Sequence, residues 1–295
     1  MIKIKESMIY IFSVYNKYKQ VIGESFMLLK GAAIIGLLLS ILGFLLGVYD
    51  VWWGIPVGFI VLMLAVLLLW IVCCFVYTRF ISFKKPVIRH SRLNRFFANC
   101  VIDTVRQFFR IKIHVSGMDK LPEEKFLLVC NHRSNMDPIL TMGVLKKWNI
   151  GFVAKKELYK LPVISRLMHK CFCLCLDREN VKEGAKVILR AGEIVGEGLA
   201  SIGIYPEGTR SKEEEMLPFM HGAFKIAKKA ESPIVVSVIR NTELAAKNFP
   251  WKKTDVYLEF IGVISADVVK EHNTVELSNM AREMMEARLK SVKLS

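Results

Sequence analysis

The chain has 295 residues, and its lysines and arginines outnumber its aspartates and glutamates, 42 against 27, for a net charge of +15. Such an excess indicates an anionic partner, either a nucleic acid or a membrane surface. A mean hydropathy of +0.35 with 53% hydrophobic residues argues against a soluble nucleic-acid-binding protein. The seven cysteines form no disulfide framework, which suits a reducing compartment.

The N-terminal part of the chain carries the strongest membrane signal. The first 30 residues mix lysines with aromatic and aliphatic residues near helical spacing, which predicts an amphipathic segment lying in the membrane interface. Residues 31–49 and 51–78 contain no charge, and each run reaches the roughly 20 residues that a helix needs to span a bilayer. We therefore predict a two-helix membrane hairpin over residues 31–78, with either a spanning or a re-entrant path.

The basic residues on either side of this hairpin predict its orientation. Lysines and arginines precede and follow the two apolar runs but do not occur between them, which places both ends, and the domain that follows, on the cytoplasmic side. Residues 79–110 then interleave basic side chains with phenylalanines. Such mixtures also bind single-stranded nucleic acid. Directly after a membrane segment they favour helices lying on an anionic leaflet, with no nucleic-acid partner.

From Ile111 onward the sequence alternates between short apolar runs and amphipathic segments. This pattern predicts an α/β domain over residues 111–295, with a mostly parallel sheet flanked by helices on both faces. The predicted strands are Ile111–Val115, Phe126–Cys130, Ile150–Ala154, Cys171–Leu176, Ser201–Tyr205, Pro233–Ile239 and Val256–Ile261. The predicted helices are Pro138–Lys147, Leu161–His169, Val181–Gly198, Gly222–Ala230 and Val275–Leu289.

The stretch Cys130-Asn131-His132-Arg133-Ser134-Asn135-Met136-Asp137-Pro138 combines a histidine with a carboxylate. It follows a predicted strand, and Asp137 and Pro138 suit the N-cap and the first position of a helix. His132 then lies in a strand-to-helix loop, where the turn can bring Asp137 beside it. A histidine oriented by a carboxylate is equipped to act as a general base.

Three further strand ends carry cations. Tyr205-Pro206-Glu207-Gly208-Thr209-Arg210-Ser211 follows one predicted strand, and Arg178 and Lys155 follow two others. Glycine allows a tight turn, and arginine offers a planar set of donors suited to phosphate. Open α/β sheets bind ligands at the carboxyl ends of their strands. Together with His132, these cations suit activation of a hydroxyl on a phosphate-bearing molecule.

The cysteines raise two alternatives. Cys130 and His132 would share one side of an extended segment, so Cys130 could act as a nucleophile activated by His132. A buried strand residue is the favoured interpretation. Cys171, Cys173 and Cys175 lack the spacing of a zinc site and are interpreted as one packed strand, so we predict no metal.

The motifs together resemble those of the glycerophospholipid acyltransferases. Asn-His-Arg-Ser-Asn-Met-Asp fits the histidine and aspartate signature of that family, and Tyr-Pro-Glu-Gly-Thr-Arg-Ser fits its glutamate-glycine-threonine-arginine block with Tyr205 in place of phenylalanine. Leu-Asp-Arg and Val-Ala-Lys-Lys-Glu-Leu fit two further blocks, and order and spacing agree over roughly residues 111–240. Two departures, after Val235 and after Phe219, place substrate identity in more doubt than the chemistry.

The resemblance, which is closest to the 1-acyl-glycerol-3-phosphate acyltransferases, implies an O-acyltransferase of phospholipid biosynthesis. An acyl group would pass from a thioester to the free hydroxyl of the lysophospholipid, forming phosphatidic acid. His132 would remove the hydroxyl proton and Asp137 would fix the imidazole. The residues implied to hold or surround the acceptor phosphate are Arg210, Arg178, Lys155, Glu207, Gly208 and Thr209, with Glu207 bracing an arginine or meeting the glycerol hydroxyl.

The implied partners are the bilayer, the lysophospholipid and an acyl donor, with no cofactor. The donor is left open between coenzyme A, acyl-carrier protein and acyl phosphate. Two alternative functions remain at this point. One is acylation of another lyso-lipid or of glycerol 3-phosphate, and the other is lipid binding by a catalytically idle membrane protein.

Overall fold

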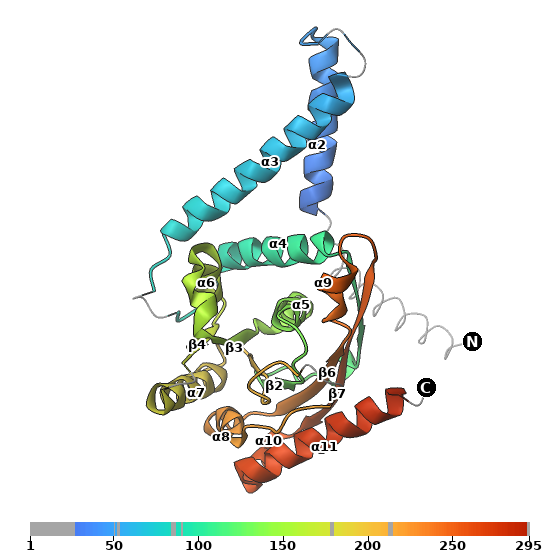
Figure 1. Ribbon diagram of the computed structural model, residues 1–295. Helices are drawn as coiled ribbons and strands as arrows, with labels where there is room; N and C mark the ends of the chain where they lie inside the picture. The colour runs from blue at the N-terminus through green and yellow to red at the C-terminus, as the bar shows by residue number, and fades with distance from the viewer. Residues whose placement is uncertain are drawn as a thin grey trace, which may run out of the picture. The chain divides into compact units, whose positions relative to one another are not determined.

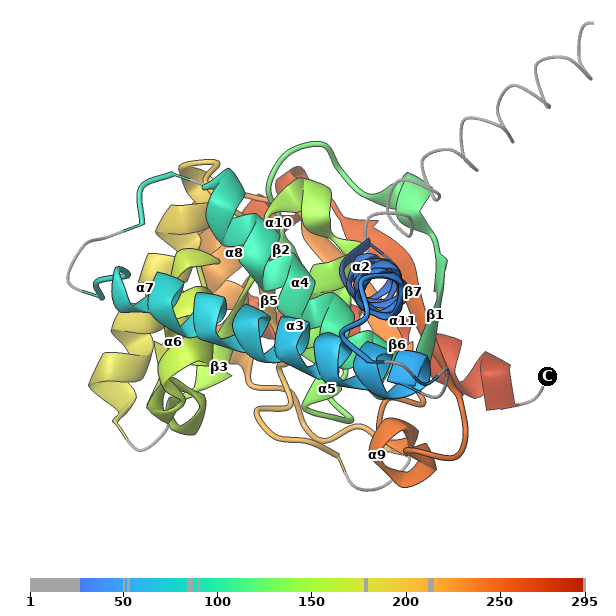
Figure 2. The same cartoon turned by 90° about the horizontal axis from the view of Figure 1, so that it is seen from above.

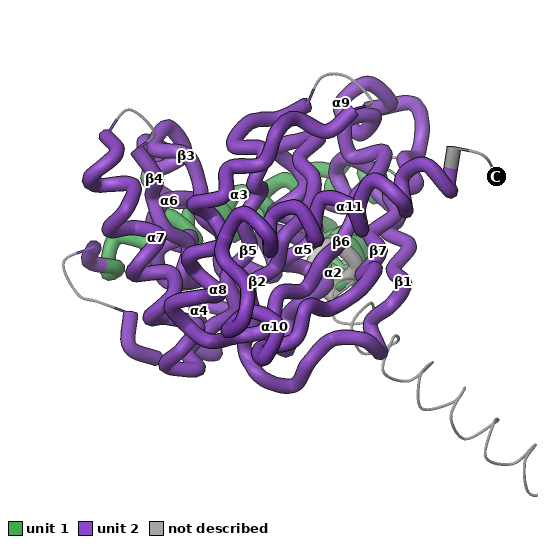
Figure 3. The backbone as a smooth tube through the Cα atoms, turned by 90° about the horizontal axis from the view of Figure 1, so that it is seen from below, with its two compact units in different colours: residues 1–81 green, residues 82–295 purple. Residues whose placement is uncertain are grey.

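The structure is a computed structural model, and it divides the chain into two compact units, residues 1–81 and 82–295 (Figure 3). Most of the predicted amphipathic lead-in lies outside the described residues, as does Arg178. The structure describes residues 27–49, 51, 54–83, 87–89, 91–177, 180–211 and 215–293.

In the first unit two helices, α2 (Met27–Leu45) and α3 (Gly54–Arg79), pack together through small residues. A Cβ atom on Gly36 would lie 3.6 Å from the backbone nitrogen of Met63, and one on Gly58 would lie 2.7 Å from the hydroxyl of Ser40. That hydroxyl donates to the Ile55 carbonyl at 2.6 Å. Small residues that let two backbones approach closely are characteristic of helix pairs in membranes.

Only one of these helices is long and apolar enough to cross a membrane within the described residues. α3 has 26 residues, which at 1.5 Å per residue is about 39 Å, and its mostly exposed surface is apolar. The apolar part of α2, Ala33–Leu45, is shorter, at about 20 Å. α2 ends at Leu45, where a turn begins, although the uncharged run of the sequence continues to Tyr49. Within the described residues, α3 therefore has the length and composition of a membrane span, and the two-helix membrane hairpin stays a prediction.

The second unit is built on a seven-stranded sheet flanked by helices, as the alternating pattern predicts (Figure 1). The strands are β1 (Ile111–Ser116), β2 (Leu127–Cys130), β3 (Gly151–Lys155), β4 (Leu174–Leu176), β5 (Ile202–Ile204), β6 (Ile234–Arg240) and β7 (Thr254–Ile264). The helices are α4 (Arg92–Phe108), α5 (Met136–Val144), α6 (Pro162–Lys170), α7 (Val181–Gly196), α8 (Lys225–Ala230), α9 (Leu244–Asn248), α10 (Ala266–Glu271) and α11 (Thr274–Lys293).

Alternate side chains of the buried strands face two separate cores. Leu127 and Val129 of β2 pack into a core with α7, α8, α10 and α11. Leu128 and Cys130 of the same strand pack into a second core with α4 and α5. Because successive side chains of a strand point to opposite faces, a strand covered on both sides is apolar throughout. This explains the continuous apolar run that predicted β2.

The order of the strands is β1-β7-β6-β2-β5-β3-β4. β6, β2, β5, β3 and β4 are mutually parallel, so their carboxyl ends meet at one edge of the sheet. β7 runs antiparallel to β6 and parallel to β1, which makes the sheet mixed. Figures 1 and 2 show β3, α6 and α7 at one end of this unit and β1 and β7 at the other. The motifs that follow β2, β5, β3 and β4 therefore lie along this one edge of the sheet, which is called the strand-end rim below.

The predicted strand over Cys171–Leu176 is wrong in its first half. Only Leu174–Leu176 form β4, because residues 171–173 close the end of α6. Phe172 adopts a left-handed φ of 60°, its N–H donates to the His169 carbonyl, and the N–H of Cys173 donates to the Met168 carbonyl. These two bonds define a Schellman motif, which normally has glycine where Phe172 stands. The three cysteines consequently do not form one strand.

Asn131 fixes the point at which the chain leaves the sheet. β2 ends at Cys130, which pairs with Ser237 of β6. The next residue, Asn131, is 3% exposed. Its Oδ1 accepts a hydrogen bond from the N–H of Ile239 at 2.8 Å, and its Nδ2 donates to the Ile239 carbonyl at 3.0 Å. The side chain thus continues the hydrogen-bond ladder for one further step, directly before His132.

Replacing Asn131 with alanine should destabilise this unit. The N–H and C=O groups of Ile239 would be left buried without partners, and each such loss costs roughly 1–3 kcal/mol. We expect Asn131→Ala to lower the free energy of unfolding by about 2–4 kcal/mol, measured by denaturation of the detergent-solubilised chain. Asn248→Ala is the matched control, because that amide makes one bond, to Thr254 at 3.0 Å, in a partly exposed position. Equal destabilisation by the two variants would contradict this account.

Candidate active site

His132 and Asp137 are in direct contact. Nδ1 of His132 lies 2.8 Å from Oδ2 of Asp137, whose side chain is fully buried. The same oxygen accepts the backbone N–H groups of Arg133 at 2.7 Å and Ser134 at 2.8 Å. One carboxylate oxygen therefore fixes both the imidazole and the loop that carries it.

The position of Asp137 differs from the expected N-cap. α5 begins at Met136, after Asn135 as the N-cap residue, so Asp137 is the second residue of the helix. Its side chain turns back over the loop rather than capping the first turn. A carboxylate in the first turn is also favoured by the positive end of the helix dipole. The N-cap position that the sequence suggested for Asp137 is thus incorrect, and its Oδ2 makes all three contacts, to His132, Arg133 and Ser134.

The backbone of His132 is held on both sides by the loop after β5. Its N–H donates to Oε1 of Glu207 at 2.7 Å, and its carbonyl accepts the N–H of Ser211 at 2.9 Å. Oε2 of Glu207 accepts the N–H of Leu217 at 2.8 Å. Both oxygens of this buried carboxylate are occupied by backbone groups. Glu207 therefore braces the His132 loop, instead of the arginine or glycerol hydroxyl expected for it.

The carboxyl group of Glu207 is held in an environment that opposes its charge. Burial raises the pKa of Glu207 above its usual value, and the hydrogen bonds from Leu217 and His132 act in the opposite direction. A group whose pKa is raised by burial makes its ionised form costly in the folded protein. The two backbone bonds keep this cost small enough for the carboxylate to serve as an acceptor.

Tyr205 packs directly on the histidine. The rings of Tyr205 and His132 are stacked, with centroids 4.2 Å apart and an interplanar angle of 16°. The ring of Phe152 also stacks on Tyr205, with centroids 5.5 Å apart. The imidazole is therefore fixed by a hydrogen bond at one edge and by an aromatic ring on one face.

The backbone N–H groups of this loop are already in use. Those of His132, Arg133 and Ser134 all donate to carboxylates. Backbone N–H groups in a loop beside a general base are common donors to the oxyanion of an acyl-transfer intermediate. In this conformation these three N–H groups face Asp137 and Glu207 and are not available for that role.

The predicted phosphate-binding cations lie at the ends of neighbouring parallel strands. Lys155 ends β3, Arg210 follows β5, and both side chains are exposed. Gly208, between Glu207 and Arg210, has a left-handed φ of 71°, which explains glycine in this turn. Thr209 is exposed beside it. Neither Lys155 nor Arg210 is recorded in an ion pair among the described residues, so both can meet a ligand.

A cavity of about 270 Å³ adjoins the His132 loop. Arg133 and Arg240 contribute two cations that the sequence analysis did not identify. Arg133 is paired with Glu243 at 3.1 Å, and Arg240 with Glu259 at 2.6 Å. Both arginines lie at the same edge of the sheet as His132. The closeness of Arg240 to His132 depends on the order of the strands, which the sequence alone does not reveal. Other residues that line the cavity include Asn131, Glu207, Ser211, Glu215, Asn241 and Leu289.

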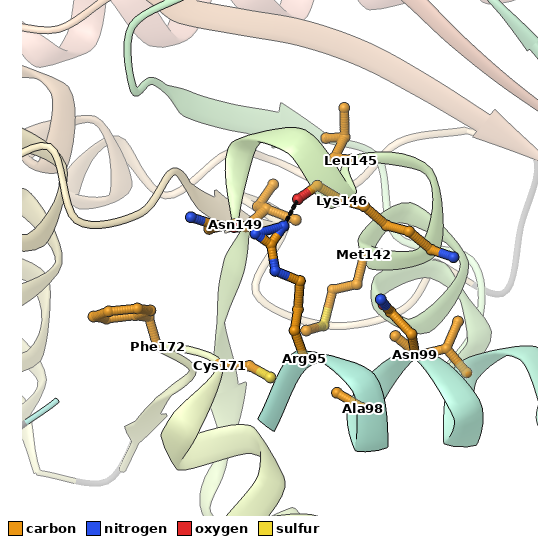
Figure 4. A pocket seen from close by; sticks show the side chains of 11 residues that line it. Arg95, Ala98, Asn99, Met142, Leu145, Lys146, Asn149, Cys171 and Phe172 are labelled. Atoms are coloured by element: carbon orange, nitrogen blue, oxygen red, sulfur yellow. Dashed lines mark hydrogen bonds between the residues drawn. The ribbon is translucent and has the colours of Figure 1, made fainter. Parts of the chain in front are cut away.

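A second, smaller cavity of about 30 Å³ lies between α4 and the far end of α5 (Figure 4). Arg95 enters it from α4 and donates to the Lys146 carbonyl at 2.5 Å. Cys171 also lines it, and burial raises the pKa of this thiol to about 12, which makes the thiol inert. The space holds one or two water molecules at most. Among the described residues no group of three histidine, cysteine, aspartate or glutamate side chains could hold a metal ion.

Cys130 is poorly suited to nucleophilic attack. It is 1% exposed at the end of β2, and its Sγ lies 3.7 Å from Oδ1 of Asn131. Burial raises the pKa of this thiol well above its ordinary value, and nearby Asp137 and Glu207 add to the effect. Since the thiolate is the nucleophile, a buried neutral thiol is unreactive. The geometry therefore favours a structural role for Cys130.

Comparison with known proteins agrees with the motifs. Residues 112–240 match the family model described as Acyltransferase. The 1-acyl-sn-glycerol-3-phosphate acyltransferase of Saccharomyces cerevisiae is 26% identical over 199 residues, which are 66% of this chain and 65% of the relative. The protein of that name from Haemophilus influenzae is 27% identical over 182 residues, covering 61% and 75%. A probable member from Mycoplasma genitalium is 36% identical over 134 residues, covering 44% and 49%.

These matches span between about half and three quarters of the relatives' lengths. A solved structure has the same fold. It is the crystal structure of the 1-acyl-sn-glycerophosphate (LPA) acyltransferase PlsC from Thermotoga maritima, with a TM-score of 0.56, 22% identity, and coverage of 89% of this chain and 98% of that chain. At this identity the likeness concerns the fold alone. The region that matches the family model includes both the His132 loop and the Glu207 loop, so the likeness to acyltransferases covers the candidate site.

Proposed function

We propose that this protein transfers a fatty acyl group from a thioester to the free hydroxyl of 1-acyl-glycerol 3-phosphate, forming phosphatidic acid. The observation that carries the proposal is the bond between His132 and Asp137 at 2.8 Å, at a strand-end rim that also bears exposed cations. The names of the curated relatives supply the substrate class.

The geometry suits a direct transfer. Nδ1 of His132 faces Asp137, which leaves Nε2 to accept the hydroxyl proton of the acceptor. The hydroxyl oxygen attacks the thioester carbonyl, and the tetrahedral intermediate then expels the thiolate. The imidazolium returns its proton to the leaving sulfur. Asp137 stabilises the imidazolium and holds the tautomer, without taking the proton itself.

Lys155 and Arg210, with Arg178 beyond the described residues, are proposed to hold the acceptor phosphate. Arg210 follows β5, which is the neighbour of β2, and Lys155 ends β3, the next strand beyond β5, so a ligand held by these cations lies on the same side of the sheet as His132. A doubly charged phosphate is a strong acceptor for such cations. Gly208 and Thr209 are proposed to line the approach to this phosphate, because they lie in the same turn as Arg210.

The membrane is proposed to supply the acceptor. α3 is long and apolar enough to cross a bilayer, and Arg79 lies in its last turn. Lysines and arginines lie before the first apolar run and after the second but not between them, which favours a cytoplasmic location for the domain that follows. The basic segment before β1 adds attraction to anionic lipid, about 1 kcal/mol for each lysine or arginine near the surface. The domain would then meet lysophospholipid and product in one leaflet.

An acyl-transfer assay with crossed substrates tests this function. Purified full-length protein in mixed micelles is given lysophosphatidic acid, lysophosphatidylcholine or glycerol 3-phosphate, each with acyl-coenzyme A, acyl-carrier protein or acyl phosphate. The proposal requires phosphatidic acid from lysophosphatidic acid with at least one thioester. Transfer only to another acceptor, or only from acyl phosphate, would identify a different acyltransferase. Binding of lysophosphatidic acid without consumption of any donor would identify a lipid-binding protein.

Removal of the base should abolish transfer. General base catalysis is worth about 10²–10⁴-fold, so we expect His132→Ala to lower kcat by at least 10²-fold in the same assay. Asp137→Asn should lower it by a similar factor, because an amide favours the wrong imidazole tautomer. Retention of more than a tenth of the activity by a folded His132→Ala variant would overturn the mechanism.

Removal of the Cys130 thiol separates direct transfer from a covalent mechanism. We expect Cys130→Ala to keep kcat within about threefold of the wild type, because a buried protonated thiol is not a nucleophile. Rapid-quench analysis should detect no acyl-enzyme on the wild-type protein. A folded but inactive Cys130→Ala variant, or an acyl group recovered on Cys130, would establish the covalent route.

Loss of the Arg210 guanidinium should affect the acceptor and not the donor. We expect Arg210→Ala to raise KM for lysophosphatidic acid about tenfold or more, as loss of a charge-assisted contact of about 1.5–3 kcal/mol implies. KM for the thioester should stay unchanged. Lys160→Ala, which removes another cation from the segment after β3, serves as the control. An equal effect on the donor would remove Arg210 from the phosphate site.

A further inference from the structure

Three buried polar atoms lie behind the His132–Asp137 pair without hydrogen-bond partners among the described residues. They are Oδ1 of Asp137, Oγ1 of Thr141 and the hydroxyl oxygen of Tyr205. The side chains of Asp137 and Thr141 are fully buried, and Tyr205 is 9% exposed. A buried polar atom without a partner is costly, and such atoms are rare in folded proteins. Three such atoms close to His132 require an explanation.

The three atoms come from two elements that meet at this point. Asp137 and Thr141 are four residues apart on α5, so their side chains share one face of the helix. Tyr205 follows β5, and its ring is already fixed by stacking on His132. Its hydroxyl lies close to the Thr141 side chain and to the charge of Asp137. Burial first, and then the charge of Asp137, raise the pKa of Tyr205 well above its usual value, so the hydroxyl remains a donor.

We propose that Tyr205 and Thr141 are positioning residues, which form a buried hydrogen-bond relay to the free oxygen of Asp137. The Tyr205 hydroxyl donates to Oγ1 of Thr141, and the Thr141 hydroxyl donates to Oδ1 of Asp137. Two donated protons satisfy all three atoms. No proton is transferred along the relay.

The relay controls how strongly Asp137 attracts a charged imidazole. Oδ2 already accepts three hydrogen bonds, and the relay supplies a donor to the remaining oxygen. Donation to Oδ1 spreads the carboxylate charge, so the imidazolium form of His132 is stabilised less. More of His132 is then neutral and able to accept a proton. This role rests on the proposed function, in which His132 is the base.

Other charges around His132 are unaffected by removal of the two hydroxyls. Apart from Tyr205 itself, the titratable or charged groups around the site are Asp137 on α5, Glu207 in the loop after β5, Cys130 at the end of β2, and Arg133 in the His132 loop. Tyr205→Phe keeps the ring that stacks on His132 and removes only the hydroxyl. Thr141→Val keeps the shape of the side chain and removes only its hydrogen bonds.

The experiment compares Tyr205→Phe, Thr141→Val and the double variant with the wild type, all as full-length protein in detergent. Thr141→Ser restores the hydroxyl. Thr242→Val is the matched control, because Thr242 is also buried with an unpartnered hydroxyl but lies after β6. Three quantities are measured: the pH profile of kcat/KM for lysophosphatidic acid, the titration of the His132 imidazole by NMR, and the thermal midpoint of unfolding.

The relay predicts a common result for Tyr205→Phe and Thr141→Val. The acid limb of kcat/KM should move to higher pH by about half a unit, and the His132 titration should move with it, since the carboxylate becomes a better partner for the imidazolium. The double variant should show no larger shift than either single variant, because both hydroxyls belong to one chain. Thr141→Ser should return the limb to its wild-type position. Thr242→Val should leave it there.

Thermal unfolding distinguishes a hydrogen-bonded relay from three polar atoms that have no partners. If the hydroxyls have no partners, their removal raises the thermal midpoint; if they form the relay, removal lowers it. A raised midpoint, or an unchanged His132 titration in Tyr205→Phe and Thr141→Val, would overturn the relay. The NMR and thermal measurements need no substrate. Failure of the acyltransferase function would appear instead as an inactive wild type, and the relay would still be decided.

Discussion

The candidate site depends on a carboxylate buried between two loops. Glu207 accepts the N–H of His132 through one oxygen and the N–H of Leu217 through the other, while Ser211 donates to the His132 carbonyl. The loops belong to β2 and β5, which are adjacent and parallel. Because both backbone groups of His132 are bonded to the β5 side, the imidazole has little freedom except rotation of its own side chain. Asp137 and the Tyr205 ring then remove that freedom.

The fixed position of the His132 imidazole matters for its proposed role as a general base. A general base contributes most when it is held at hydrogen-bond distance from the proton it removes. In this protein the conformational entropy of the His132 loop is lost when the sheet folds, because all the bonds that fix the loop lie within one domain. The cations are held less tightly: the side chains of Lys155 and Arg210 are long and exposed, so they can adapt to the position of a ligand. A fixed base beside adaptable cations suits a substrate with one reacting hydroxyl and a mobile lipid tail.

The features that could be predicted from the sequence are those that depend on residues close together in the chain. All seven strands were found because apolar runs of four to eight residues are visible in one sequence, and the proximity of His132 and Asp137 follows from five-residue spacing across a turn. Contacts between distant residues were not visible. The bond from His132 to Glu207 spans 75 positions and that from Asn131 to Ile239 spans 108. The end of α6 was missed because Phe172 occupies a left-handed position that glycine usually marks.

The reversed strand β7 has a consequence for how such a protein can change. The segment that joins β6 to β7, residues 241–253, starts at the reactive rim because β6 ends there. It carries Glu243, which pairs with Arg133 across the larger cavity. Insertions or deletions in this connection would reshape one wall of that cavity while leaving β2 and β5 undisturbed. A change of length in this connection can therefore alter the cavity without moving His132.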